Sequence, residues 1–300
     1  MPRKIIYLIN PVSGVKPKSS LIKLLERRTR EQEIEFDIVQ TPAACDYKTL
    51  LKKIHHEQFT DIVICGGDGT VNAVAAALNT YDINVGIIPM GSGNGLAYTA
   101  KIPKQASRAL DIIFKGKTSR IDALYINEKF SCMLCGIGFD AQVAHEFAKQ
   151  KRRGLQTYIK VATIQYFKAR PYFFDININN ESIQTEAYFI CIANSNQFGN
   201  NFTIAPQASL NDGLLDIVIV KKMSKFILPF SVISQVTGIN AIQSVSEFTN
   251  TRNIMYLQSA EMTIRNPEMA PLHIDGDPSE TSAIFNIRIQ KKCIRLIQPE

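Results

Sequence analysis

Three glycines surround one carboxylate in the segment Gly66-Gly67-Asp68-Gly69, a spacing that suits phosphate chemistry. Glycine lets backbone N–H groups approach a ligand closely, and the N–H groups at a helix start attract anions. An apolar run at residues 61–64 leads into the segment, and apolar residues at helical spacing follow it through residues 71–78. We interpret the segment as a phosphate-binding turn between a strand and a helix, with Asp68 as an acid beside the phosphate.

Two further turns of small residues follow apolar runs. Gly91-Ser92-Gly93-Asn94 comes after residues 84–88, and Asn10-Pro11-Val12-Ser13-Gly14 comes after residues 5–9. Each alone could be an ordinary turn, because Asn-Pro and Ser-Gly are common turn formers. Glycine costs stability inside a regular element, so two glycine-rich turns after neighbouring strands need a local use. The three turns are predicted to face one phosphate-binding site.

The elements that must position these turns alternate along the first third of the chain. Strands are predicted at residues 5–9, 35–39, 61–64 and 84–88, and helices near residues 21–28, 47–54, 71–78 and 106–114. This alternation implies a parallel sheet covered on both faces. Ligands of such sheets bind at the carboxyl ends of the strands, where the three turns and Thr41 fall.

The pattern changes after about residue 122 to closely spaced strand-like runs. These are residues 130–135, 172–178, 187–193, 214–220, 255–257, 262–265 and 284–289. Several alternate with period two, which favours an antiparallel sandwich. Helical segments interrupt them near residues 142–169 and 225–244. The prediction is an α/β domain at residues 1–122, to which a last strand at about 290–300 could return, and a β-sandwich domain at residues 123–300.

Composition limits the class of protein. With 300 residues, 45% of them hydrophobic and 20% charged, the chain has the balance of a soluble globular protein. Its net charge of +7 favours an anionic partner without choosing among nucleotide, nucleic acid and membrane. Residues 5–9 are too few for a signal-peptide core, and no apolar run approaches the roughly 20 residues that span a bilayer. We therefore expect a cytoplasmic protein.

The six cysteines predict reduced thiols in the core rather than a metal site. They stand at positions 45, 65, 132, 135, 191 and 293, mostly inside apolar runs. Cys132 and Cys135 form a C-x-x-C pair, but residues three apart in a strand point to opposite faces, and no second pair of ligands follows. A zinc site is therefore disfavoured.

Four motifs in this order resemble the diacylglycerol kinase catalytic superfamily of lipid kinases, which includes bacterial lipid kinases and sphingosine and ceramide kinases. They are Asn10-Pro11-x-Ser13-Gly14, Gly66-Gly67-Asp68-Gly69-Thr70-x-Asn72, Pro89-x-Gly91-Ser92-Gly93-Asn94 and Asp275-Gly276-Asp277. The resemblance covers essentially the whole chain. It implies an amino-terminal α/β nucleotide domain of the phosphofructokinase-like type, a β-sandwich lipid domain and a cleft between them.

The resemblance also implies roles for individual residues. ATP contact is carried onto Asn10, Pro11, Ser13, Gly14, Thr41, Gly66, Gly67, Asp68, Gly69, Thr70, Asn72, Gly91, Ser92 and Asn94. Asp68 would hold the catalytic magnesium, and Asp275 and Asp277 match the family's Asp-Gly-Glu, whose acids act as base toward the lipid hydroxyl. A structural magnesium would be bound by Ser209, Asp212 and Leu214, although an Asp-Gly turn entering a strand explains that segment equally well. Asp122 would lie near the active-site acids.

Two positions depart from the family pattern. Asp277 is one methylene shorter than the family's Glu, which could shift the role of base to Asp275 or require a closer approach of the substrate. Gly95 stands where many bacterial members have Asp, and this form is closer to sphingosine-kinase-like sequences. The identity of the acceptor lipid is therefore open.

The expected activity is ATP- and magnesium-dependent phosphorylation of a diacylglycerol-like or sphingoid-like lipid, within phospholipid metabolism. The alternatives are an NAD kinase, whose family shares the Gly-Gly-Asp-Gly-Thr core, and a non-catalytic nucleotide-binding regulatory module. The basic run at residues 149–153, followed by aromatic and aliphatic residues, is either a solvated helix face or a peripheral contact with an anionic membrane. Nucleic-acid binding is not expected, because no recognised module accompanies the charge. A second copy of the chain, in a homodimer, is a further candidate partner.

Overall fold

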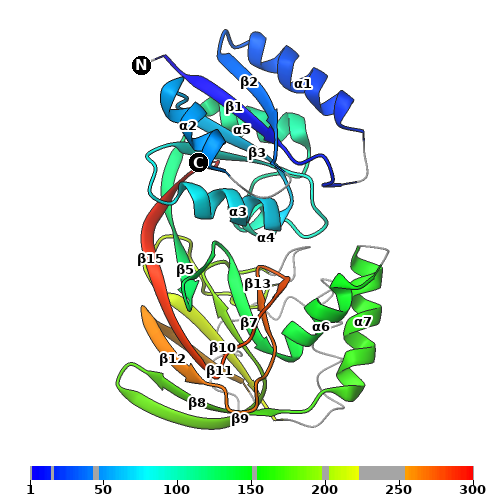
Figure 1. The fold of residues 1–300 in the computed structure, drawn as a ribbon, viewed down its shortest axis with the longest axis vertical. Helices are drawn as coiled ribbons and strands as arrows, with labels where there is room; N and C mark the ends of the chain where they lie inside the picture. The colour runs from blue at the N-terminus through cyan, green and yellow to red at the C-terminus, as the bar shows by residue number, and fades with distance from the viewer. Residues whose placement is uncertain are drawn as a thin grey trace. The chain divides into compact units, whose positions relative to one another are not determined.

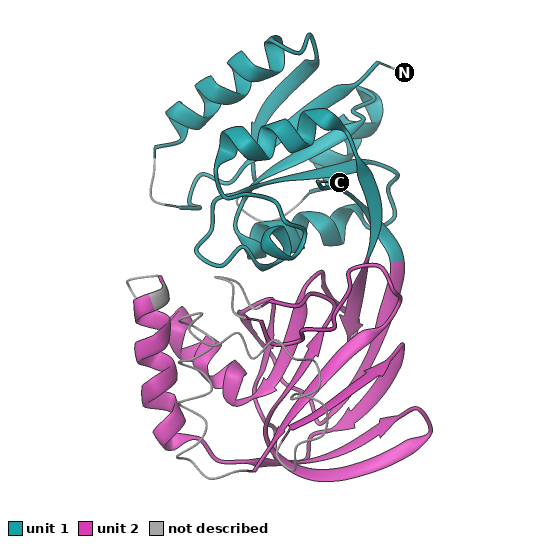
Figure 2. Ribbon diagram, turned by 180° about the vertical axis from the view of Figure 1, so that it is seen from behind, with its two compact units in different colours: residues 1–121, 292–300 teal, residues 122–291 magenta. Residues whose placement is uncertain are grey.

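The computed structural model divides into two compact units, residues 1–121 with 292–300 and residues 122–291 (Figure 2). It describes residues 2–14, 17–42, 47–150, 154–197, 203–222 and 254–299. The segment near residues 225–244, predicted to be helical, lies outside the described residues. Each unit is described by itself below, and Figure 1 shows the path of the chain.

The first unit is a parallel sheet with the helices between its strands. Its elements are β1 (Lys4–Ile9), α1 (Lys18–Arg30), β2 (Glu35–Gln40), α2 (Lys48–His56), β3 (Asp61–Gly66), α3 (Asp68–Leu78), β4 (Asn84–Pro89), α4 (Gly95–Thr99) and α5 (Ala106–Lys115). All six residues of β3 are buried, as expected for a central strand with both faces covered. The predicted alternation of strands and helices is confirmed.

The strand order of this sheet contains a switch point. Strand β1 pairs in parallel with β2 on one side and with β3 on the other, and β4 follows beyond β3. The order β2-β1-β3-β4 therefore reverses direction between β1 and β3. In open α/β sheets the crevice beside the carboxyl ends of such a strand pair is the usual place for a ligand.

The second unit is built from antiparallel strands. Its elements are β5 (Thr118–Ile126), which enters it from the first unit, β6 (Lys129–Ser131), β7 (Leu134–Gly138), α6 (Phe139–Ala148), α7 (Leu155–Lys168), β8 (Tyr172–Ile178), β9 (Glu181–Ala193), β10 (Leu215–Lys221), β11 (Ile254–Ser259), β12 (Glu261–Arg265), β13 (Leu272–Ile274), β14 (Asp277–Ser279) and β15 (Ile284–Ile297). Strand β8 alternates between buried and more exposed residues, as its period-two pattern predicts.

Strand β9 joins the two layers of the sandwich. Its first half pairs with β8, and its second half pairs with β7 on one edge and β10 on the other. The layers enclose one apolar core, in which Phe174, Ile190 and Phe285 are at most 1% exposed. The predicted fold class, an α/β domain followed by a β-sandwich, is confirmed.

Several predicted boundaries in this unit are wrong. Residues 130–135 form two strands rather than one, because the chain breaks at Cys132 and Met133, for a reason that the site makes plain. The predicted strand at residues 187–193 begins earlier, at Glu181, and β5, β13 and β14 are additional strands. The helical segment near residues 142–169 contains two helices, α6 and α7.

Strand β15 is shared by the two units. Its residues 284–288 pair antiparallel with β12 in the second unit. Farther along, Arg295 and Leu296 pair in parallel with Asn84 and Val85 of β4, so the end of the chain adds a fifth strand to the sheet of the first unit.

Candidate functional site

Asn10 connects the ends of the two strands at the switch point. Its backbone N–H donates to the carbonyl oxygen of Cys65 at 3.0 Å, and its side-chain Nδ2 donates to Thr70 Oγ1 at 2.7 Å. Its Oδ1 accepts from the N–H of Val12 at 3.0 Å, which shapes the turn after β1. One side chain therefore fixes the turn after β1 against the first turn of α3.

The carboxylate of Asp68 is held by backbone N–H groups from the turn after β4. Oδ2 accepts from Asn94 N at 2.6 Å and Oδ1 accepts from Gly95 N at 2.8 Å. Asp68 is the first residue of α3, where a negative charge is favoured by the helix dipole. Both oxygens are thus oriented by backbone donors that cannot rotate away.

Asn94 closes the turn after β4 on itself. It adopts a left-handed backbone conformation with φ of 59°. Its Oδ1 accepts from the N–H of Gly91 at 2.8 Å, and its Nδ2 donates to the carbonyl oxygen of the same residue at 2.8 Å. Asparagine tolerates this conformation better than most residues. Two hydrogen bonds within the turn therefore hold its shape without a ligand.

Glycine is required where the two turns meet. A Cβ on Gly91 would lie 2.7 Å from Gly67 Cα, and a Cβ on Gly67 would lie 3.1 Å from Gly91 Cα. The turn after β1 approaches the same place, because a Cβ on Gly14, whose φ is +69°, would lie 2.7 Å from the Met90 carbonyl oxygen. Backbone approaches backbone at these positions, as in a phosphate-binding turn.

The other predicted nucleotide residues lie on the same elements. Pro11 and Ser13 belong to the turn after β1, Gly69, Thr70 and Asn72 to the start of α3, and Ser92 to the turn after β4. Thr41 follows β2, and its N–H donates to the Ile9 carbonyl oxygen at 3.0 Å. Sequence reasoning missed Lys18, whose ammonium group donates to the carbonyl oxygen of Ser13. A lysine at the start of α1 was a usable signal, because it follows the first turn within five residues.

The Asp275-Gly276-Asp277 motif forms a hairpin in the second unit. Ile274 of β13 pairs with Asp277 of β14, so Asp275 and Gly276 are the two turn residues. Their φ values are 49° and 83°. Two positive φ values define the tight turn type that prefers Asp-Gly. Asp277 is the first residue of β14, and its side chain is exposed.

The carboxylate of Asp275 is buried and accepts three hydrogen bonds at one oxygen. Its Oδ1 accepts from Ser131 Oγ at 2.6 Å, Leu134 N at 3.0 Å and Met133 N at 3.2 Å. These donors turn toward the carboxylate and not toward a neighbouring strand, which is why β6 ends at Ser131 and β7 begins at Leu134. Asp275 therefore organises the chain around residues 131–134.

The loop predicted to bind a structural magnesium is shaped by two aspartates. The Asp212 Oδ1 accepts from Leu214 N at 3.0 Å, and the Asp122 Oδ2 accepts from Gly213 N at 2.7 Å. Ser209 Oγ donates to Asn211 Oδ1 at 3.1 Å. Asp212 is exposed and the loop offers carbonyl oxygens, so the donor set is of the hard kind that magnesium takes. Within the described residues, no group of three or more His, Cys, Asp or Glu is placed to hold a metal ion.

The described cysteines are core residues. Cys65, Cys132, Cys135, Cys191 and Cys293 are buried and form no disulfide, and Cys45 lies outside the described residues. Burial, reinforced by the negative charge of Asp275, raises the pKa of the Cys135 thiol well above its ordinary value. A neutral thiol is a poor metal ligand.

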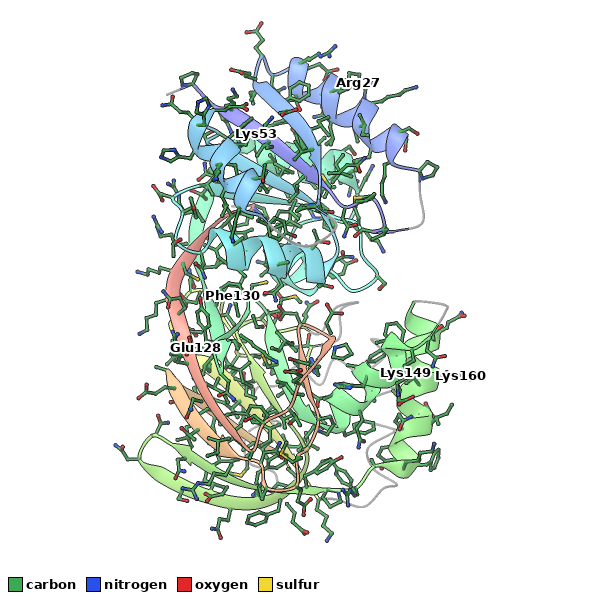
Figure 3. All side chains as sticks on the ribbon, viewed as in Figure 1. Arg27, Lys53, Glu128, Phe130, Lys149 and Lys160 are labelled. Atoms are coloured by element: carbon green, nitrogen blue, oxygen red, sulfur yellow. The ribbon has the colours of Figure 1, made fainter. Side chains whose placement is uncertain are left out.

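Helix α7 carries apolar side chains on its exposed face. Phe167 is 71% exposed, Ile164 45% and Ile159 38%. Lys160, labelled with Lys149 in Figure 3, lies on the same helix. Of the predicted basic run, Lys149 pairs with Glu146 at 2.6 Å, and residues 151–153 lie outside the described residues. In the described parts of the chain, no helix is both long and apolar enough to cross a membrane.

Comparison with known proteins matches both units to one kind of protein. Residues 4–126 match the diacylglycerol kinase catalytic domain, and residues 134–298 match the YegS C-terminal NAD kinase beta sandwich-like domain. A protein of Shewanella frigidimarina named "Probable lipid kinase YegS-like" is 25% identical over 100% of this chain and 95% of its own length. The diacylglycerol kinase of Bacillus subtilis is 24% identical over 91% of this chain and 89% of its own length.

A solved structure has the same fold. The crystal structure of a diacylglycerol kinase from Bacillus anthracis superposes with a TM-score of 0.75 at 17% identity, covering 99% of this chain and 97% of that chain.

Proposed function

Because the chain belongs to the family of lipid kinases that joins a diacylglycerol kinase catalytic domain to a YegS-type C-terminal domain, we propose that it transfers the γ-phosphoryl group of ATP to a hydroxyl of a diacylglycerol-like or sphingoid-like lipid. The first unit binds ATP, and the second unit binds the lipid and supplies the base. Relatives named as lipid kinase and diacylglycerol kinase support the acceptor class.

The observation that carries this proposal is the Asp68 carboxylate at the switch point. Three glycine-containing turns converge there, and two backbone N–H groups fix the carboxylate before ligand binds. Phosphoryl transfer needs little covalent chemistry from the protein, and it depends on positioning and on neutralising charge. The proposed nucleotide contacts are the turn residues Asn10, Ser13, Gly67, Gly91 and Ser92, with Lys18 as an added cation beside them.

Magnesium is the proposed metal at Asp68. The Asp68 carboxylate supplies the oxygen ligands that a hard cation takes, and two backbone N–H groups orient it beside the glycine-containing turns. When bound, magnesium would neutralise charge on the transferring phosphoryl group. Asp212, with the Ser209 and Leu214 carbonyl groups, is proposed as the second, structural site.

Asp277 is the proposed base. Its side chain is exposed at the start of β14, whereas the Asp275 carboxylate is buried and accepts three hydrogen bonds. A carboxylate of Asp277 accepts the proton of the lipid hydroxyl while that oxygen forms a bond to the γ-phosphorus. The bond from the γ-phosphorus to the bridging oxygen of ADP breaks, and ADP leaves. Asp275 then has a supporting role, which is to hold the hairpin that carries Asp277.

The exposed face of α7 is proposed to bring the enzyme to its substrate. Ile159, Ile164 and Phe167 are exposed beside Lys160 and Lys168, which is the pairing of apolar and basic groups that binds anionic bilayers. We expect the wild type to sediment with phosphatidylglycerol vesicles and Phe167→Ser to do so less. Phe173→Ser, at an exposed phenylalanine of β8, is the control. Equal sedimentation of the two variants would contradict this role for α7.

A product-identification assay tests the activity. The purified full chain is incubated with radiolabelled ATP, magnesium and mixed micelles that contain a panel of lipid alcohols, and in parallel with NAD. We expect label in the organic phase and a phosphorylated lipid by mass spectrometry. Label in NADP would identify an NAD kinase instead. Binding of ATP without transfer to any acceptor would favour a regulatory module, the reading that Gly95 and the short Asp277 suggest.

A further inference from the structure

A buried acid and histidine lie next to the Asp275-Gly276-Asp277 hairpin and have no part in the mechanism above. His273 Nε2 lies 3.3 Å from Asp140 Oδ2, and the two side chains are 2% and 8% exposed. Asp140 belongs to the first turn of α6, and His273 is the central residue of β13. An apolar pair could fill such a space without the cost of burying polar groups. The pair therefore needs a purpose beyond filling the core.

The hydrogen bonds around His273 fix its tautomer. The backbone N–H of Gly276 points at His273 Nδ1, 3.2 Å away, and a backbone N–H can only donate. Nδ1 is therefore the acceptor, and the ring proton is on Nε2, where it is donated to Asp140 Oδ2. The other oxygen of Asp140 accepts from the N–H of Ala141 at 2.8 Å. The hydrogen bonds therefore run in one direction: Gly276 donates to His273, and His273 donates to Asp140.

The backbone makes room for this contact at one position. A Cβ on Gly136 would overlap both Asp140 Oδ2 and His273 Nε2 and would lie 2.6 Å from Asp140 Cγ. Gly136 pairs with His273 across β7 and β13. A side chain at this position would separate the acid from the histidine, so the sequence keeps the space between them open.

The contact acts on the residue that precedes the proposed base. Gly276 is the second turn residue of the hairpin, with φ of 83°, and Asp277 follows it directly. The first turn residue is held from the other side, because Asp275 donates its N–H to the Leu134 carbonyl oxygen at 2.9 Å. The bond to Leu134 thus holds the first turn residue, and the bond to His273 holds the second, Gly276. The direction of the Asp277 side chain follows from the peptide that His273 fixes.

We propose that His273 and Asp140 are positioning residues that hold the Gly276 N–H and so aim the Asp277 carboxylate at the acceptor hydroxyl. This inference rests on the proposed function. His273 does not itself meet the substrate, because its side chain is 98% buried and both ring nitrogens are engaged within the protein. Displacing a reacting group by about 1 Å can cost roughly 10²-fold in rate.

Two conservative variants separate positioning from packing. In His273→Asn the amide oxygen replaces Nδ1 as acceptor for Gly276, whereas in His273→Gln the amide nitrogen replaces Nε2 as donor to Asp140. His273→Asn removes more volume from the core than His273→Gln does, so a role in packing alone would harm His273→Asn more, which is the opposite of the order expected for positioning. We expect His273→Asn to keep kcat within about threefold and His273→Gln to lose on the order of 10²-fold, with the KM for ATP unchanged in both.

A control and a second measurement complete the test. His145→Gln is the matched control, because His145 Nε2 contacts the Leu272 carbonyl oxygen of the same hairpin but not its turn. Hydrogen–deuterium exchange of a peptide spanning the turn should rise in His273→Gln and not in His273→Asn. ¹⁵N-histidine NMR of the wild type should show the Nε2–H tautomer at His273.

The outcomes distinguish this inference from the proposed function. Equal kcat in the two His273 variants, or equal exchange at the turn, would overturn the positioning role. The exchange and NMR measurements need no substrate. They therefore decide whether His273 holds Gly276 even if the wild type phosphorylates no lipid, a result that would instead refute the proposed function.

Discussion

Two aspartate-glycine turns, one in each unit, have similar sequences and opposite constructions. In the turn after β3, backbone N–H groups from another turn hold the Asp68 carboxylate and leave it only partly buried. In the turn before β14, the Asp275 carboxylate is buried and accepts hydrogen bonds from residues 131–134. The exposed carboxylate belongs to Asp277, two residues later. In the first turn one carboxylate, Asp68, is held in place and also faces the proposed ligand. In the second turn these tasks are separate, because Asp275 holds the turn and Asp277 is exposed.

The largest effect is expected at Asp68. In Asp68→Asn the charge is lost, and an amide N–H₂ must face one of the two backbone donors from Asn94 and Gly95. We expect phosphoryl transfer to fall by about 10³-fold or more, equivalent to roughly 4 kcal/mol of transition-state stabilisation. Asp111→Asn, at an exposed carboxylate that contacts Arg28, is the control. Transfer at wild-type rates in Asp68→Asn would refute the metal role.

The next effects should separate the two carboxylates of the hairpin. Asp277→Asn removes the proposed base, so kcat should fall on the order of 10²-fold while the urea midpoint of unfolding stays unchanged. Asp275→Asn should destabilise the fold by about 2–3 kcal/mol, because a charged acceptor of three hydrogen bonds is lost. The comparison would be wrong if Asp277→Asn destabilised the protein as much as Asp275→Asn does.

The turns of the first unit should tolerate no side chain where they meet. Gly91→Ala places a Cβ 2.7 Å from Gly67 Cα, so the turn after β4 must shift. We expect ATP affinity, measured by calorimetry, to fall about tenfold. Ser107→Ala is the control, because Ser107 lies on α5 and not in the turns. Gly116→Ala would not serve, because the positive φ of Gly116 would strain an alanine. Unchanged affinity in Gly91→Ala would show that this close approach does not shape the nucleotide site.

The smallest effect concerns a third aspartate, which belongs to neither turn. Asp216 is buried, and its Oδ1 accepts from Tyr256 and Gln258. Among the described residues, its Oδ2 has no hydrogen-bond partner. Burial raises the pKa of this carboxyl above its ordinary value. The folded state therefore holds the proton more tightly than the unfolded state, and stability falls as pH rises above about 4.

This sign predicts the behaviour of Asp216→Asn. The variant should gain stability relative to the wild type between pH 4 and pH 7, by no more than about 1.5 kcal/mol. Urea unfolding at the two pH values measures the difference. A gain that does not change with pH would mean that the Asp216 carboxyl is not the source.

The sequence predicts where the nucleotide turns fall but not what holds them. Buried strands followed by glycine-rich segments predict the positions of Gly66, Asp68 and Gly91, because parallel strands place their carboxyl ends at one edge. The hydrogen bonds from Asn94 and Gly95 to Asp68 join residues that are 26 and 27 positions apart, so a local sequence pattern does not predict them. The left-handed conformation of Asn94 is likewise imposed by its contacts with Gly91.

The hairpin shows the same limit over a longer range. Asp-Gly predicts a tight turn, but the break between Ser131 and Leu134 depends on a carboxylate more than 140 positions away. Local pattern at residues 130–135 favours one strand, and the tertiary contact overrides it. The assignments of individual site residues to ATP, base and metal stay predictions.

The sharing of β15 between the units has a consequence for how the protein is made. Arg295 and Leu296 pair with Asn84 and Val85, so the edge of β4 stays open until synthesis has passed residue 296. An unpaired strand edge invites pairing with other chains. The nascent first unit is therefore exposed to aggregation throughout translation of the second, and loss of residues 291–300 would leave that edge permanently uncovered.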